Sequence, residues 1–192
     1  LKLVDENGNI IKNVRNIEEK EKSLTGIVKA IIKNDYTEPA WLYAYNKTFW
    51  NKNKFNYEKG KIHEDYGLTP IILSKANSIG LLDYPGYNYV QRKNSIMNQK
   101  SYEKLKKRTL DFKYFYMQHK KYILPNNKVN KMLLGFSAEA MLYKTRELKH
   151  LEQKEMISFL KKERVVSQIY PFTLKKCFQK LYLHLFLNKY IE

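Results

Sequence analysis

Cysteine, proline and glycine are scarce in this chain of 192 residues. Cys177 is the only cysteine, so the chain has no internal disulfide and no Cys-x-x-Cys pair, which fits a reducing compartment. None of the 7 glycines forms a phosphate-binding Gly-rich loop, and no Ser/His/Asp arrangement supports a hydrolase. Residues 1–9 lack the pattern of a secretory signal, and no charge-free apolar stretch approaches the ~20 residues of a membrane-spanning helix.

Acidic residues are also in short supply. The chain has 19 Asp and Glu against 36 Lys and Arg, which gives a formal net charge of +17. Such an excess favours anionic partners, namely nucleic acid, anionic lipid or phosphorylated substrates, and charge alone does not choose among them. Hydrophobic residues make up 43% of the chain, enough to form a core. We therefore expect a folded protein that is soluble or peripheral to a membrane.

Local patterns divide the chain near Asn98, where mixed elements give way to helices. Before this point, helical periodicity and capping residues predict helices over about residues 23–34 and 63–76. Aromatic and apolar runs predict strands near residues 1–4, 41–49, 79–83 and 87–92, with turns at 5–9 and 85–86. After it, we expect helices over about residues 101–123, 128–148, 152–166 and 171–190.

Residues suited to chemistry gather between positions 39 and 98. Glu64 and Asp65 stand side by side at the start of an expected helix. Unpaired backbone N–H groups and the positive end of the helix dipole there would keep a carboxylate ionised, as a general base must be. Further along, the aromatic and basic segment 87–95 offers stacking surfaces and a guanidinium, that of Arg92, able to bind phosphate. A glycosidase is excluded because consecutive helix residues do not face a common point.

The order and spacing of these residues resemble the C-terminal half of family 2 glycosyltransferases, of the bacterial capsule, exopolysaccharide and lipopolysaccharide type. The resemblance is carried by Pro39-Ala40-Trp41, then Glu64-Asp65, then Tyr87-x-Tyr89-x-x-Arg92-x-x-Ser95-Ile96-Met97. It covers roughly residues 1–98 and implies the acceptor-side half of a GT-A domain. We therefore expect an α/β domain with a mixed sheet over residues 1–98, followed by a basic, all-α extension over residues 99–192.

The resemblance implies an inverting transfer of a sugar from a nucleotide-diphosphate donor to a glycan or lipid-linked acceptor. Asp65 would be the general base that deprotonates the acceptor hydroxyl, and Glu64 would hydrogen-bond near the acceptor. A divalent ion, Mg²⁺ or Mn²⁺, would stabilise the departing nucleoside diphosphate in the full-length enzyme. Substrate contacts are expected from Trp41, Tyr89, Gln91, Arg92 and Ser95.

The donor-side pattern of that family does not occur in these residues. No Asp-x-Asp motif, whose carboxylates would hold the metal, is present in the sequence, so no metal ligand is assigned. The turn at residues 5–8 resembles the one that follows the metal-binding strand, and we therefore expect the donor half to precede residue 1. Gln91-Arg92 lacks the Gln-x-x-Arg-Trp pattern of processive synthases, which favours single-sugar transfer. The alternative for this chain is a truncated, non-catalytic remnant or interaction module.

Structural roles compete with each of these assignments. Asp65 could be only a helix N-cap, and Arg92 could pair with a structural carboxylate. Tyr87 and Tyr89 alternate along the expected strand and face one side, so Tyr89 could belong to a packed core. Trp41 could equally be a core residue. His63 is expected to be a loop residue rather than a metal ligand.

The last expected helix, residues 171–190, is basic and amphipathic. Lys176, Lys180 and His184 recur at four-residue spacing. A broad apolar arc is formed by Phe178, Leu181, Tyr182, Leu185 and Phe186. Such a helix can lie at a membrane interface, which would suit a cytoplasmic enzyme at the inner face of the cell membrane. Alternatively, the arc packs on the other tail helices or on a second subunit of a homodimer. Nucleic-acid binding is the least favoured hypothesis, since no recognition motif accompanies the basic clusters.

Overall fold

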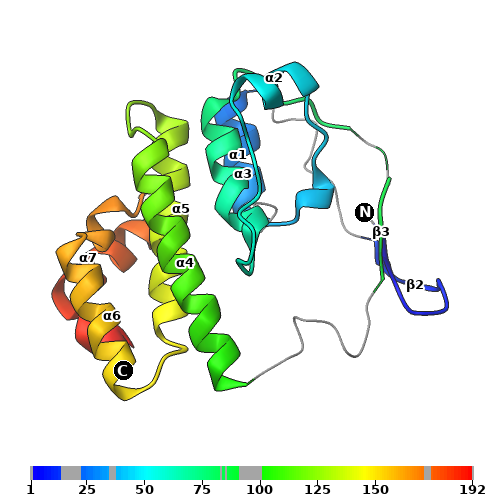
Figure 1. The fold of residues 1–192 in the computed structure, drawn as a ribbon. Helices are drawn as coiled ribbons and strands as arrows, with labels where there is room; N and C mark the ends of the chain where they lie inside the picture. The colour runs from blue at the N-terminus through cyan, green and yellow to red at the C-terminus, as the bar shows by residue number, and fades with distance from the viewer. Residues whose placement is uncertain are drawn as a thin grey trace.

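A computed structural model of the chain describes residues 2–13, 23–34, 38–82, 84, 86–90, 101–170 and 174–191 (Figure 1). The protein is mostly helical, with helix making up 65% of the structure. The predicted α/β domain built on a mixed sheet over residues 1–98 is therefore wrong. The described strands have only three or four residues each, and the described residues before position 98 bury their apolar groups mainly through helices.

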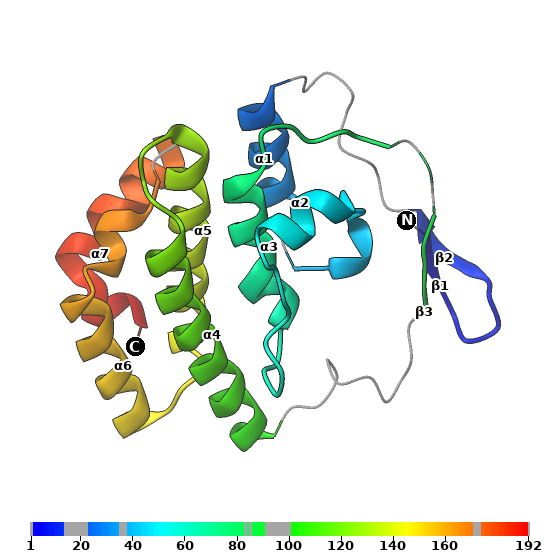
Figure 2. The same cartoon turned by 45° about the horizontal axis from the view of Figure 1, so that its top comes forward.

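Helices α4 (Tyr102–Tyr122) and α5 (Lys128–Thr145) form the middle of the molecule, joined by the turn at residues 123–127. On one side of this pair lie α6 (His150–Lys162), the 3-10 turn η3 (Val165–Gln168) and α7 (Leu174–Ile191) (Figure 1). On the other side lie α1 (Leu24–Lys33), α2 (Lys47–Lys52) and α3 (Glu64–Lys75) (Figure 2). None of the described helices combines the length and apolar character needed to cross a bilayer.

A small sheet lies beyond α1, α2 and α3, far from α6 and α7 (Figures 1 and 2). Its strands are β1 (Lys2–Val4), β2 (Ile10–Asn13) and β3 (Asn88–Val90), in the order β2-β1-β3. β1 pairs with β2 antiparallel and with β3 parallel. The turn between β1 and β2 is closed by the Asp5 carboxylate, whose Oδ1 accepts the N–H groups of Asn7 and Asn9.

Side-chain caps explain where several helices begin. Ser23 Oγ accepts the N–H of Gly26 at 3.0 Å, and Asn127 Oδ1 accepts the N–H of Asn130 at 2.9 Å. The predicted helices near residues 23–34, 63–76, 101–123 and 128–148 are confirmed by α1, α3, α4 and α5. The helix predicted over residues 152–166 ends earlier, at Lys162, and a turn at residues 163 and 164 separates it from η3. The predicted start of the last helix, residues 171–173, lies outside the described residues.

Two predicted strands are wrong. Residues 41–49 form the 3-10 turn η1 (Ala40–Leu42) and the start of α2, because Asn46 Oδ1 accepts the N–H of Phe49 at 3.0 Å and begins a helix. Residues 79–82 are irregular. The strand predicted over residues 87–92 is present as β3, and residues 91 and 92 lie outside the described part of the chain.

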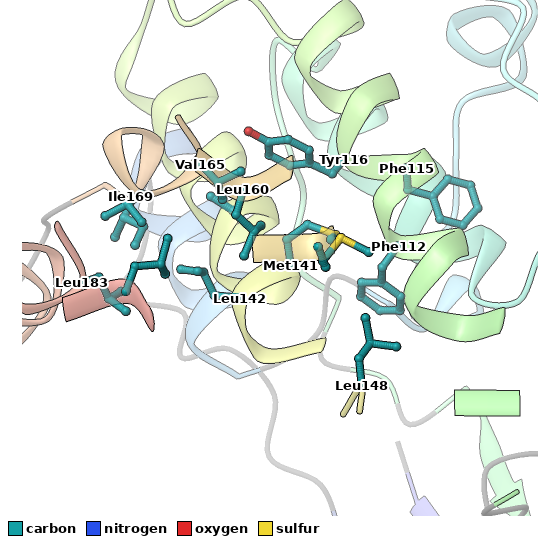
Figure 3. Close-up of a cluster of buried hydrophobic side chains, with 14 of the residues drawn as sticks. Phe112, Phe115, Tyr116, Met141, Leu142, Leu148, Leu160, Val165, Ile169 and Leu183 are labelled. Atoms are coloured by element: carbon teal, nitrogen blue, oxygen red, sulfur yellow. The ribbon is translucent and has the colours of Figure 1, made fainter. Parts of the chain in front are cut away.

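The largest buried cluster joins α4, α5, α6, η3 and α7 (Figure 3). It contains Phe112 and Tyr116 of α4, Met141 of α5, Leu160 of α6 and Leu183 of α7. A second cluster connects both sides of Asn98, the predicted domain boundary. Its members include Ile27, Val28 and Ile31 of α1, Leu73 of α3, and Met132 and Leu133 of α5. Residues 23–75 are thus packed on the helices that follow.

The contact between α3 and α4 depends on a glycine. A Cβ atom at Gly67 would lie 2.3 Å from the Phe115 ring, so no side chain fits there without displacing the ring. The close approach lets Tyr66 stack on Phe112, with ring centroids 4.2 Å apart. The first turn of α3, which carries Glu64 and Asp65, is therefore held against the middle of the molecule.

Candidate functional site

The first turn of α3 presents Glu64 and Asp65 in different surroundings. His63 is the N-cap residue, with a left-handed φ of 61° and no side-chain cap, and its Nδ1 lies 3.3 Å from Glu38 Oε2. Glu64 is exposed, whereas Asp65 is half-buried. Asp65 Oδ1 accepts the N–H of Tyr66 at 2.8 Å, and Asp65 Oδ2 accepts the N–H of Ala40 at 3.4 Å. Asp65 is thus not the N-cap of α3; its carboxylate links the helix to η1.

Trp41 of η1 belongs to an aromatic stack. The Trp41 ring is nearly parallel to that of Tyr87, with centroids 4.7 Å apart, and also stacks on Tyr89 at 5.4 Å. The Ala40 N–H that contacts Asp65 belongs to the residue just before Trp41. Through this one contact, Asp65 is connected to Trp41 and, through the ring stack, to Tyr89, both of which were predicted to bind substrate. The remaining three predicted contacts, Gln91, Arg92 and Ser95, lie outside the described residues.

An open recess adjoins the same segment, with a volume of about 420 Å³. Its lining, which we call the aromatic recess, consists of Ala40, Tyr43, Tyr45, Lys47, Trp50 and Tyr57. Burial is the main cause that raises the pKa of the Tyr45 and Tyr57 hydroxyls, and the negative charge of Asp65 adds to it. These tyrosines therefore stay neutral and able to donate hydrogen bonds at ordinary pH.

Two hydroxyls beside the recess are buried without a hydrogen-bond partner. They are Tyr45 Oη and Thr69 Oγ1, the latter on α3 one helical turn after Asp65. Thr69 and Tyr57 are polar neighbours of the Tyr45 hydroxyl, but neither closes a hydrogen bond of normal geometry with it. Buried polar groups are ordinarily satisfied by a hydrogen-bond partner, so these two hydroxyls are exceptions.

Burial raises the pKa of Asp65 above the ordinary range for aspartate. The N–H groups of Tyr66 and Ala40 oppose this effect, and the negative charges of Glu64 and Glu38 add to it. The sequence predicted that the helix terminus would hold this carboxylate ionised, but burial outweighs the backbone donors. The direction of the shift strengthens Asp65 as a proton acceptor.

A buried hydrogen-bond network fixes the turn that carries Asp65. His119 of α4 is fully buried, with Nε2 2.9 Å from the carbonyl oxygen of Gly67 and Nδ1 2.7 Å from Ser137 Oγ. The carbonyl can only accept, so Nε2 carries the proton and Nδ1 accepts from Ser137. Ser137 Oγ lies 3.3 Å from the Tyr66 hydroxyl. Burial lowers the pKa of His119 to about 4, which keeps the ring neutral.

The sequence analysis missed the aromatic recess and the His119 network. The only signal for the recess was the density of aromatic residues between positions 41 and 57, which was interpreted as a strand. A smaller recess of about 250 Å³ lies at the other end of α3, near Leu73 and Ala76, and is distant from Asp65. In the described ranges no three His, Cys, Asp or Glu side chains gather as metal ligands. The Mg²⁺ or Mn²⁺ ion expected for the full-length enzyme stays a prediction, and no described residue is assigned to it.

Comparisons of the chain with family models, with curated proteins and with solved structures find no match.

Proposed function

We propose that this chain forms the acceptor side of an inverting family 2 glycosyltransferase that uses nucleotide-diphosphate sugars, with Asp65 as the general base. The observation that carries the proposal is the half-buried Asp65, which has a raised pKa and adjoins the aromatic recess. Perturbed carboxyl groups cluster at functional sites, where burial and neighbouring charges adjust the pKa to the chemistry. The resemblance of residues 39–95 to that family agrees with this role.

In the proposed reaction, a hydroxyl of the acceptor gives its proton to Asp65 as its oxygen attacks the anomeric carbon of the donor sugar. The bond from that carbon to the diphosphate oxygen breaks, and the nucleoside diphosphate leaves with the electron pair. The flat rings of Tyr43, Tyr45, Trp50 and Tyr57 provide apolar surface against which a sugar ring can pack.

Glu64 and Trp41 take supporting roles in this proposal. Glu64 is exposed next to Asp65 and adds negative charge that favours proton uptake by its neighbour. Trp41, stacked on Tyr87 and Tyr89, holds η1 and therefore the Ala40 N–H that contacts Asp65. Binding of the donor diphosphate and its metal is assigned to no described residue. The setting that fits the proposal is the cytoplasmic face of the cell membrane, with a glycan or lipid-linked acceptor.

A non-catalytic acceptor-binding module is the second candidate. The observation that favours it is the absence of an Asp-x-Asp motif from the sequence, since that motif would hold the donor's metal ion. The two candidates agree on acceptor binding in the aromatic recess and differ only in sugar transfer.

The proposal is tested by measuring release of nucleoside diphosphate from UDP-glucose, UDP-galactose and UDP-N-acetylglucosamine, with octyl glycosides as acceptors and Mn²⁺ present. We expect Asp65→Asn to lower the rate by about 10²- to 10⁴-fold, because it removes the proton acceptor. Saturation-transfer NMR should show the octyl glycosides still bound to the variant. Glu103→Gln, which changes an exposed carboxylate on α4, is the matched control.

The outcomes separate the two candidates. Acceptor binding without nucleoside diphosphate release by the unaltered chain would support the binding module. Equal rates for the unaltered chain and Asp65→Asn would contradict the base role. Failure of every glycoside to bind would contradict both candidates.

A further inference from the structure

Helix α7 has one apolar face turned inward and a second turned outward. Leu183 and Leu187 are buried in the cluster shared with α5 and α6. Opposite them lie four apolar side chains whose exposed fractions run from 58% to 80%: Leu174, Phe178, Leu181 and Leu185. At the helical step of ~100° per residue these four fall within an arc of about 60°, centred opposite Leu183. We call this set the α7 outer face.

The α7 outer face is continuous along the helix. Its members recur three and four residues apart, so they form a stripe about 16 Å long. Tyr182, also exposed, adjoins the stripe. Single exposed apolar residues need no explanation on a protein surface, but a contiguous stripe marks a surface that binds something.

Charge identifies the partner. Helix α7 contains no acidic residue between positions 174 and 191, and it carries four lysines: Lys175, Lys176, Lys180 and Lys189. Lys176 pairs with Glu139, and Lys180 donates to the carbonyls of Ser167 and Ile169. Lys175 is exposed beside the stripe. Lys176 and Lys180 thus face the rest of the protein, whereas Lys175 borders the apolar stripe. An apolar stripe bordered by an exposed lysine, on a helix without an acidic residue, fits hydrocarbon below an anionic headgroup layer.

A second copy of the chain is a poorer occupant of the same face. Each chain has a formal net charge of +17, so two chains repel one another as they approach. Pairing two α7 helices would also bring their lysines together without an acidic residue from either helix. An anionic bilayer removes this repulsion and attracts the same lysines.

We propose that the α7 outer face binds the surface of an anionic lipid bilayer, with its apolar side chains at the boundary between headgroups and acyl chains. The inference does not rest on the proposed function. Helix α7 lies on the side of the α4–α5 pair away from α3 and Asp65 (Figures 1 and 2), so binding leaves the aromatic recess uncovered. The helix lies along the bilayer surface and does not cross it.

The test is flotation of the full chain with vesicles of phosphatidylcholine alone or with phosphatidylglycerol added. A polarity-sensitive dye on Cys177, the only cysteine and an exposed residue of α7, reports the environment of the helix. We expect binding and a blue shift with the anionic vesicles only. The triple variant Phe178→Ser, Leu181→Ser, Leu185→Ser keeps every charge and should partition about tenfold more weakly or worse. Lys175→Gln should weaken partitioning about fivefold.

The matched control is Leu82→Ser with Leu124→Ser, which removes exposed apolar groups elsewhere and should leave flotation unchanged. Circular dichroism melts establish that each variant is folded. Equal flotation of the triple variant and the unaltered chain would overturn the proposal, because charge elsewhere would then suffice. Absence of vesicle binding by the unaltered chain would also overturn it. A chain that binds no vesicles, is dimeric in light scattering and becomes monomeric in the triple variant would show that a second copy occupies the α7 outer face.

Discussion

Asp65 and Asp111 lie on neighbouring helices, yet their surroundings are opposite. Asp111 of α4 is buried and accepts hydrogen bonds from the Ile62 N–H at 3.0 Å, Lys61 Nζ at 3.0 Å and Lys107 Nζ at 2.9 Å. Asp65 of α3 accepts only from two backbone N–H groups, those of Tyr66 and Ala40. In the part of the chain that the structure describes, no cationic side chain pairs with Asp65.

The two carboxyl groups consequently titrate in opposite directions. Burial on its own would raise the pKa of Asp111, but the Ile62 N–H and the two ammonium groups outweigh it and lower that pKa. For Asp65, burial prevails and the pKa is raised. Both carboxylates join a helix to a neighbouring segment, but only that of Asp111 is balanced by cationic side chains. This difference agrees with a structural role for Asp111 and with the proposed proton-accepting role of Asp65.

The largest expected effect concerns His119, which fixes the turn that carries Asp65. Its folded-state pKa of about 4 lies below the unfolded value of about 6.5, so the unfolded chain binds the extra proton first. Stability is therefore full above pH ~6.5 and is lost as the pH falls towards 4, by about 3 kcal/mol. Urea unfolding across this pH range measures the loss. In His119→Gln the decline should be smaller by that amount, and an unchanged decline would contradict the buried neutral ring.

A substitution at Gly67 tests the close packing of α3, the helix that carries Asp65, on α4. In Gly67→Ala the new Cβ would meet the Phe115 ring, and we expect a loss of about 1–3 kcal/mol in the free energy of unfolding. Gly80→Ala is the matched control, since nothing lies within 4 Å of a Cβ atom there. Thermal melts of the two variants give the comparison. Equal stability of the two would mean that α3 does not lie this close to α4.

Removing each aspartate's charge compares the two residues directly. Asp111→Asn loses charge-assisted bonds to two lysines that are themselves partly exposed, so we expect a moderate cost of about 1–2 kcal/mol. Asp65→Asn removes a half-buried charge without a cation and should change stability by no more than about 0.5 kcal/mol. Denaturant titration at neutral pH gives both values. A larger loss for Asp65→Asn than for Asp111→Asn would reverse the assignment.

Sequence reasoning located helix starts well because capping is local. Ser23 and the Asn127 turn are followed within three residues by the groups they bind, so the pattern is visible in the chain. The same locality placed Glu64 and Asp65 at the start of a helix. Aromatic residues after Trp41 were interpreted as a strand, but they pack on Leu68 and Ile72 of α3, a contact that no local pattern encodes.

The parts that sequence reasoning missed are joined over long separations. His119 reaches the carbonyl of Gly67 across 52 positions, and Lys61 reaches Asp111 across 50. The sign of the Asp65 pKa shift was beyond prediction for the same reason, since it depends on burial by residues distant in sequence. The roles of Gln91, Arg92 and Ser95 stay predictions.

The most direct test of the contrast between the two aspartates is a ¹³C NMR titration of their carboxyl carbons in the full chain, assigned with Asp65→Asn and Asp111→Asn. We expect Asp65 to protonate above the ordinary aspartate value of about 3.9 and Asp111 to protonate below it. Protonation of Asp65 at or below the pH at which Asp111 protonates would contradict the assignment of Asp65 as the residue kept available for proton transfer.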